Sequence, residues 1–206
     1  MEITQDPNKV LKELMSGNMR FLEGESIKCA HSSLKKLKTF AETGQLPKAI
    51  LLSCSDSRAP AEMIFDQDIG DLFVIRVAGN IVAPSLVGSV EFAASTFGTS
   101  LILVMGHTEC GAIKATLNHI EDPQAIESEN IHDIVSRIRP HIFSITLIND
   151  ITDQEKITRA AKANVLASVN QLSHSSRMIE DLVQKKKIKI VGSLLDLSTG
   201  QVEFME

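Results

Sequence analysis

The sequence predicts an α/β fold with a mostly parallel sheet of about four strands, an antiparallel C-terminal edge strand, and flanking helices. Short apolar runs alternate with longer segments of helical periodicity along the 206 residues. The apolar runs show little alternation with polar residues, which is typical of strands buried on both faces of a sheet. Near the C-terminus two apolar segments are joined by a short polar turn, which indicates a closing hairpin.

Residues 1–45 are expected to form an N-terminal helical arm. Proline stands at the first helical position, Pro7, directly after an acidic residue that can cap the helix. A second helix is expected around Leu34–Phe40. We expect this arm and an α/β core over residues 46–206 to form a single domain spanning 1–206.

The core elements are predicted to alternate between strands and helices. The strands are placed at Lys48–Ser53, Leu72–Ala78, Leu101–Met105 and Ile188–Gly192, with the hairpin at Leu194–Leu197 and Val202–Phe204. The helices are placed at Pro60–Phe65, Pro84–Phe97, Cys110–His119, Ala125–Ile142 and Asp153–Leu182. Such alternation usually gives parallel strands joined by crossover helices.

Composition argues against several classes of function. The formal net charge of -5 gives no basic footprint for nucleic acid, and no apolar run is long enough to span a membrane. The first residues lack the pattern of a signal peptide, so a cytoplasmic location is expected. With 3 cysteines, metal binding or catalysis is favoured over a disulfide framework. Of these, Cys29 is expected to be a free thiol without a function.

Chemically reactive side chains follow two of the predicted strands. Cys54, Asp56 and Arg58 come directly after the first strand, and His107 and Cys110 follow the third. Ligands of open α/β sheets bind beyond the carboxyl ends of the strands, so these residues can meet at one edge. Two thiolates and an imidazole are ligands typical of zinc, and three protein ligands with one exchangeable position are typical of a catalytic site. We therefore predict one zinc ion per chain.

Asp56 has two possible positions in such a site. It could be the fourth zinc ligand and close the site, or it could pair with Arg58 and leave that position to water. A zinc ion lowers the pKa of its bound water and so supplies a hydroxide nucleophile. We expect a switch between the two states, with low pH favouring the closed one because less hydroxide competes for the metal.

The segments Cys54–Arg58 and His107–Gly111 resemble the two signature motifs of the β-class carbonic anhydrases. The likeness continues through 65–67, 70–80, 88–91 and 200–202. The resemblance implies zinc-dependent, reversible hydration of carbon dioxide to bicarbonate and a proton. It also implies a homodimer or a higher homo-oligomer, with active sites near the subunit interface.

The resemblance also assigns roles to single residues. It places the zinc ligands at Cys54, His107 and Cys110, with Asp56 as the displaceable fourth. It implies an Asp-Arg pair at Asp56 and Arg58. Substrate contacts are implied for the Gln67 side chain and for the backbone amide of Gly111.

Two other functions fit the same motifs. A hydrolase of carbonyl sulfide or carbon disulfide would use the same zinc hydroxide on a related linear molecule. A non-catalytic zinc or redox module would have Asp56 closing the site permanently, although a purely structural site would not need Arg58. Arg76, inside an apolar strand, is expected to have a structural partner. The remaining histidines lack ligand spacing and are expected at the surface or at helix ends (His31, His119, His132, His141, His174).

Overall fold

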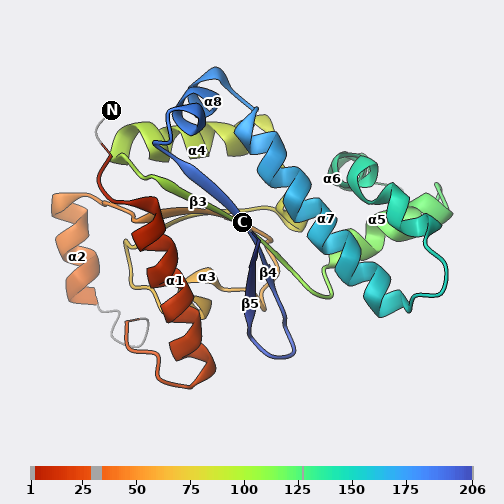
Figure 1. The fold of residues 1–206 in the computed structure, drawn as a ribbon, viewed down its shortest axis with the longest axis horizontal. Coiled ribbons are helices and arrows are strands. Elements are labelled where there is room, and N and C mark those ends of the chain that lie inside the picture. The colour runs from red at the N-terminus through yellow and green to blue at the C-terminus, as the bar shows by residue number, and fades with distance from the viewer. Residues whose placement is uncertain (1–2, 29–33, 127, 206) are drawn as a thin grey trace.

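The computed structural model describes residues 3–28, 34–126 and 128–205, so Cys29 and His31 lie outside the described residues. Their sheet has the strand order β2-β1-β3-β4-β5. Strands β1 to β4 run parallel and β5 is antiparallel to β4, which confirms the predicted fold class (Figure 1). The strands are β1 Ala49–Ser53, β2 Leu72–Arg76, β3 Leu101–His107, β4 Lys189–Leu195 and β5 Val202–Met205.

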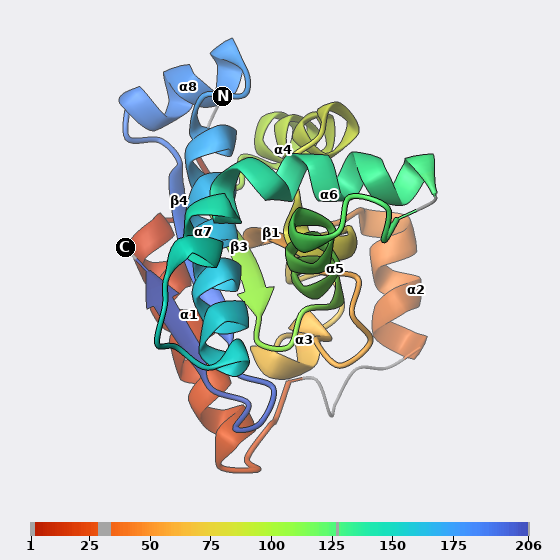
Figure 2. The same cartoon turned by 90° about the vertical axis from the view of Figure 1, so that its right-hand side faces the viewer.

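Helices cover both faces of the sheet (Figures 1 and 2). Alternate side chains of β1 and β3 point to opposite faces, as the period of a strand requires. Leu51 and Leu103 pack with α1 (Pro7–Leu22) and α3 (Ala61–Ile64). The opposite face packs against α4, α7 and α8, which span Pro84–Phe97, Asp153–Ser173 and Arg177–Gln184.

A third apolar cluster lies around the helices that follow β3. It joins α5 (Gly111–Glu121) to α6 (Glu129–Ile142), and Ile113, Ile138 and Leu194 are among its buried members. In Figure 2 these two helices lie in front of the sheet together with α7. Cys54 and Cys110 belong to the same cluster. The two thiols therefore border an apolar wall and not open solvent.

The N-terminal helix starts where the sequence predicts it. The Asp6 carboxylate accepts a hydrogen bond of 2.9 Å from the Asn8 amide, and Pro7 opens the helix. Helix α1 buries Val10, Leu11 and Leu14 against the sheet. The second helix, α2, spans Leu34–Thr43 and buries none of its described side chains.

Several boundaries differ from the prediction. The fourth strand and the first arm of the hairpin are one strand, β4, because its pairing with β3 runs without a break from Lys189 to Leu195. The helix predicted over Asp153–Leu182 is interrupted, because Ser176 caps a new helix by accepting from the Ile179 amide at 3.2 Å. Helix α6 starts only after its cap Ser128. Strand β2 ends at Arg76 and is followed by the short 3-10 turn η2, Ala78–Asn80.

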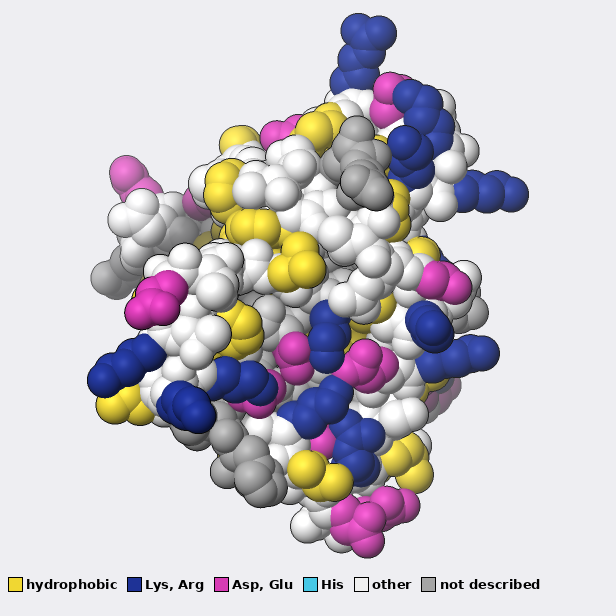
Figure 3. Space-filling model, turned by 90° about the vertical axis from the view of Figure 1, so that its left-hand side faces the viewer, with side chains coloured by type: hydrophobic (Ala, Val, Ile, Leu, Met, Phe, Trp, Pro, Cys, Tyr) yellow, Lys and Arg dark blue, Asp and Glu magenta, His cyan; other side chains and the backbone are white. Residues whose placement is uncertain are grey.

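The surface shows no single dominant charge on the face drawn in Figure 3. Basic and acidic side chains are interspersed there, and hydrophobic side chains form small separate areas. The 3-10 helix η3 (Phe143–Leu147) follows α6 directly. Within the described residues, no helix is long and apolar enough to cross a membrane.

Candidate metal centre

The pairing of β1 with β3 brings the two reactive segments together. Ser53 lies opposite Met105 in the parallel register, so the chain leaves both strands at the same edge of the sheet. Cys54 follows Ser53 directly, and β3 continues through Gly106 to His107. The prediction ended this strand at Met105, two residues early. The longer strand fixes the His107 backbone by pairing it with β4.

Cys54, His107 and Cys110 form the one group of potential metal ligands found among the described residues. Their ligand atoms all lie within 4.8 Å of one another, and all three residues are buried. Two sulfur ligands of a tetrahedral zinc ion at Zn–S of about 2.3 Å are separated by about 3.8 Å. The group therefore has the donor atoms and the spacing that zinc needs.

The orientation of the His107 ring supports the same conclusion. His107 is 1% exposed, and its Nδ1 lies 2.8 Å from the Thr108 carbonyl oxygen, which requires Nδ1 to donate. Nε2 is then the nitrogen with a free lone pair. It is buried and has no hydrogen-bond partner among the described residues. A buried acceptor without a partner is costly, and a metal ion would satisfy it.

The two thiols share one negative charge when no metal is bound. A hydrogen bond from Cys110 lowers the pKa of Cys54 to about 4, although burial alone would raise it. The neighbouring Cys54 thiolate and burial both raise the pKa of Cys110. Burial lowers the pKa of His107, but the Cys54 thiolate, the Thr108 carbonyl oxygen and the Asp56 carboxylate together outweigh this, so that pKa is raised overall. A divalent cation would replace this proton sharing by binding both sulfurs as thiolates.

Asp56 lies beside these ligands and is paired with Arg58. The Arg58 Nε and Nη2 atoms donate to the two carboxylate oxygens at 2.9 and 2.7 Å, and the Arg58 amide adds a bond of 2.9 Å. The Arg58 guanidinium holds the pKa of the Asp56 carboxyl far below its usual range. One carboxylate oxygen is 3.8 Å from His107 Nε2, too long for a hydrogen bond. Of the two predicted positions of Asp56, the structure shows the one paired with Arg58.

Other contacts fix the two segments that carry the ligands. Arg76 donates to the carbonyl oxygens of Cys54 at 2.9 Å and Asp56 at 2.5 Å, so its predicted structural partner is the backbone after β1. The Arg58 Nη2 also reaches the Glu109 carbonyl oxygen at 3.4 Å. Glu109 has a φ of 59°, in the left-handed region, between His107 and Cys110. Arg58 and Arg76 thus hold the backbone of both ligand-bearing segments in place through hydrogen bonds.

The predicted substrate contacts lie in different surroundings. Gly111 is the exposed first residue of α5, where backbone amides lack partners inside the helix. Gln67 is fully buried, and its side-chain nitrogen donates to the carbonyl oxygens of Phe65 and Asp66 at 2.8 and 3.1 Å. These bonds connect Gln67 to its own loop and not to the three ligands.

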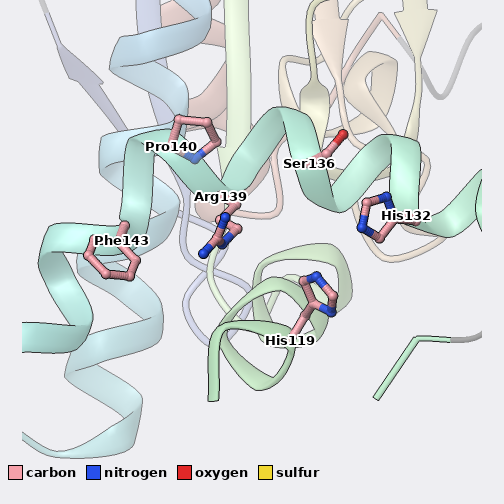
Figure 4. Close-up of a pocket in the computed structure, with 6 residues that line it drawn as sticks. All are labelled: His119, His132, Ser136, Arg139, Pro140 and Phe143. Atoms are coloured by element: carbon pink, nitrogen blue, oxygen red, sulfur yellow. The ribbon is translucent and has the colours of Figure 1, made fainter. Parts of the chain in front are cut away.

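A cavity lies away from the metal centre, between α5 and α6 (Figure 4). It has a volume of about 430 Å³ and is lined by His119, His132, Ser136, Arg139, Pro140 and Phe143. Figure 4 shows the His119 and His132 side chains near each other, and their ring centroids are 5.2 Å apart. None of the lining residues belongs to the cluster of Cys54, His107 and Cys110.

One contact to the cluster is not indicated by the sequence pattern. The Gly79 amide donates to Cys54 Sγ at 3.4 Å, and Gly79 belongs to the turn η2. The Gly-Asn pair after the second strand is a turn signal in the sequence. That signal identifies the turn but not the sulfur that its amide contacts.

Comparison with known proteins assigns this geometry to a family. The carbonic anhydrase family model matches residues 49–202. The chain is 32% identical over 198 residues to a carbonic anhydrase of Mycolicibacterium smegmatis, which covers 96% of this chain and 93% of that protein. It is also 32% identical over 196 residues to carbonic anhydrase 2 of Mycobacterium tuberculosis, covering 95% and 91%.

A solved structure agrees on the class. The β-carbonic anhydrase CcaA matches with a TM-score of 0.75 at 25% identity, over 96% of this chain and 95% of that chain. This chain belongs to the β-class carbonic anhydrases. The β-carbonic anhydrases of Sordaria macrospora, described as tetrameric, share the fold with a TM-score of 0.72 at 22% identity, over 96% and 97%.

Family membership confirms the activity class predicted from the motifs. The chain is a carbonic anhydrase, an enzyme class that hydrates carbon dioxide. Its group of Cys54, His107 and Cys110 fits a zinc ion. Both signature segments lie inside the matched region 49–202.

Proposed function

We propose that this carbonic anhydrase hydrates carbon dioxide reversibly with one zinc ion held by Cys54, His107 and Cys110. The observation that carries the proposal is the buried His107 Nε2, which lacks a partner among the described residues and belongs to a group whose ligand atoms lie within 4.8 Å of one another. A zinc ion bound there would lower the pKa of a water molecule and supply the nucleophile that attacks carbon dioxide.

Asp56 and Arg58 are proposed as the catalytic pair. The bidentate bond keeps Asp56 ionised, so its carboxylate can accept a hydrogen bond from the reacting water and orient it. The same bond gates the fourth ligand position, since Asp56 cannot enter that position while Arg58 holds both of its oxygens. Release of Asp56 at low pH would close the site.

Two substrate contacts are part of the proposal. The Gly111 amide, at the start of α5, can donate to an oxygen of the substrate because the helix does not use it. The Gln67 side-chain oxygen is buried without a hydrogen-bond partner among the described residues, which supports a role in binding a donor. The hydroxyl group of bicarbonate is such a donor.

We also propose that residues 1–206 act as one domain that self-associates as a homodimer or a tetramer in the cytoplasm. The packing of α1 on the sheet supports the single domain. Strand β2 is an outer strand of the sheet, and Phe92 of α4, whose ring centroid lies 6.3 Å from that of Phe73 of β2, is 53% exposed. An open strand edge beside an exposed aromatic ring is a suitable surface for a second copy.

Stopped-flow carbon dioxide hydration across pH tests the proposal. Zinc-loaded protein should hydrate carbon dioxide rapidly with a rate that rises with pH, and Cys110→Ala should abolish it. Absence of hydration at every pH, in protein holding one zinc per chain, would refute the proposal. Activity restricted to carbonyl sulfide or carbon disulfide would assign the site to that hydrolase reaction instead.

A further inference from the structure

The turn that contacts Cys54 has an unusual backbone. Gly79 and Asn80 have φ values of 71° and 43°, so two successive residues lie in the left-handed region. Both residues are buried. A side chain on Gly79 would approach Ile138 Cδ1 to 2.7 Å and Ala112 Cβ to 2.9 Å. The turn is therefore compressed against α5 and α6, with its Gly79 amide directed at Cys54 Sγ.

Helix α7 holds this turn from the other side with two buried polar side chains. Asn164 Nδ2 donates to the Gly79 carbonyl oxygen at 2.8 Å. Ser168 Oγ, one helical turn later, donates to the Asn80 carbonyl oxygen at 3.1 Å. Both side chains belong to residues that are 2% exposed. Polar groups are costly on a buried helix face unless they are bonded, so these two bonds specify one position of the turn.

We propose that Asn164 and Ser168 are positioning residues for the metal centre. They hold the turn η2 so that the Gly79 amide donates to the Cys54 sulfur. That bond withdraws electron density from the sulfur and fixes its direction, which tunes the metal that Cys54 binds. The inference rests on the proposed metal-binding role of Cys54, and it extends the site to α7, about 110 residues further along the chain.

The test replaces Asn164 and measures the metal directly. Asn164→Ala should weaken zinc binding by about 10- to 100-fold in a chelator competition, the usual effect of losing such support. In cobalt-substituted protein, the sulfur-to-cobalt charge-transfer band should move to lower energy, because a thiolate without its hydrogen bond holds its electrons less tightly. Ser168→Ala, the milder variant, should move both quantities in the same direction.

Asn18→Ala is the matched control. Asn18 is also buried, and its side chain donates to the Ile64 and Gly200 carbonyl oxygens at 3.2 and 3.0 Å, on the α1 face of the sheet. Its loss should lower thermal stability but leave the zinc affinity and the cobalt band unchanged. If Asn18→Ala moved the band as much as Asn164→Ala, the role of Asn164 would be general stability and the inference would be overturned.

Two further outcomes separate this inference from the proposed function. If Asn164→Ala and Ser168→Ala shift neither the cobalt band nor the zinc affinity of the wild-type protein, the inference alone is overturned. A wild-type protein without any sulfur-to-cobalt band overturns the metal assignment and the inference together.

Discussion

Gly106 provides a test of how closely α7 packs on the strand that carries His107. A Cβ atom on Gly106 would lie 2.5 Å from Val165 Cγ2, whereas carbon atoms normally approach to about 3.5–4.0 Å. Strand β3 is buried along its whole length and Val165 is fully buried, so neither can move freely. Gly106→Ala should therefore lower the free energy of unfolding by about 1–3 kcal/mol.

The double variant identifies the cause. Val165→Ala alone removes two methyl groups and should cost about 2 kcal/mol, but it creates the space that the methyl group added by Gly106→Ala needs. The double variant should then be about as stable as Val165→Ala alone, a coupling of about 1–3 kcal/mol. Gly192→Ala is the control, since its Cβ would lie 3.0 Å from Val165 Cγ1 and should cost less than Gly106→Ala.

Urea unfolding at one fixed protein concentration measures these differences, because self-association would make stability depend on concentration. Thermal midpoints should fall by about 2–4 °C per kcal/mol for a chain of this size. If the losses in free energy of unfolding from Gly106→Ala and Val165→Ala simply add in the double variant, the steric explanation and the close packing behind it are refuted.

Three further predictions concern charge, gating and the substrate. Arg58→Gln should reduce carbon dioxide hydration about 10- to 100-fold in stopped-flow assays by releasing Asp56. Arg137→Gln breaks a comparable bidentate bond, to Asp133 at 3.0 and 3.1 Å, and should leave the rate unchanged. Equal losses in the two variants would contradict gating by the Asp56–Arg58 pair. Burial alone would raise the pKa of Glu13, but hydrogen bonds from Lys28 and Lys48 outweigh it and lower that pKa below its ordinary 4.5. The ionised Glu13 therefore stabilises the fold fully above pH 4.5. This stabilisation is lost as the pH falls through the lowered pKa. Glu13→Gln should thus cost up to about 1 kcal/mol at neutral pH and nothing in strong acid, as urea titrations at several pH values would show; a cost independent of pH would be the contrary result. Gly111→Ala should keep both stability and the Michaelis constant, since nothing lies within 4 Å of its Cβ position and its amide is retained; a large rise in that constant would argue that the proposed substrate contact is not made by the backbone.

The sequence predicted the parts of the site that depend on local pattern. Apolar runs located β1 and β3, and the strand-end rule for parallel sheets placed Cys54, His107 and Cys110 at one edge. The geometry of these three residues agrees with that expectation. The Asp-Arg pair followed from the spacing of Asp56 and Arg58 and is present as a bidentate bond.

Features that depend on tertiary pairing were not predictable. Gly106 and His107 have no strand signal of their own, and β4 incorporates them into β3. Asn164 and Ser168 look like ordinary polar residues of a helix, because their partners Gly79 and Asn80 are more than eighty residues away. The break between α7 and α8 depends on the cap at Ser176, which competes with a continuous apolar face.

The most direct test of the metal centre is zinc X-ray absorption spectroscopy on purified protein, combined with metal analysis. We predict one zinc per chain with two sulfur ligands at about 2.3 Å and lighter ligands at about 2.0–2.1 Å, and loss of one sulfur or of the metal in Cys110→Ala. A zinc shell without sulfur, or a shell that Cys110→Ala leaves unchanged, would contradict the assignment of Cys54, His107 and Cys110.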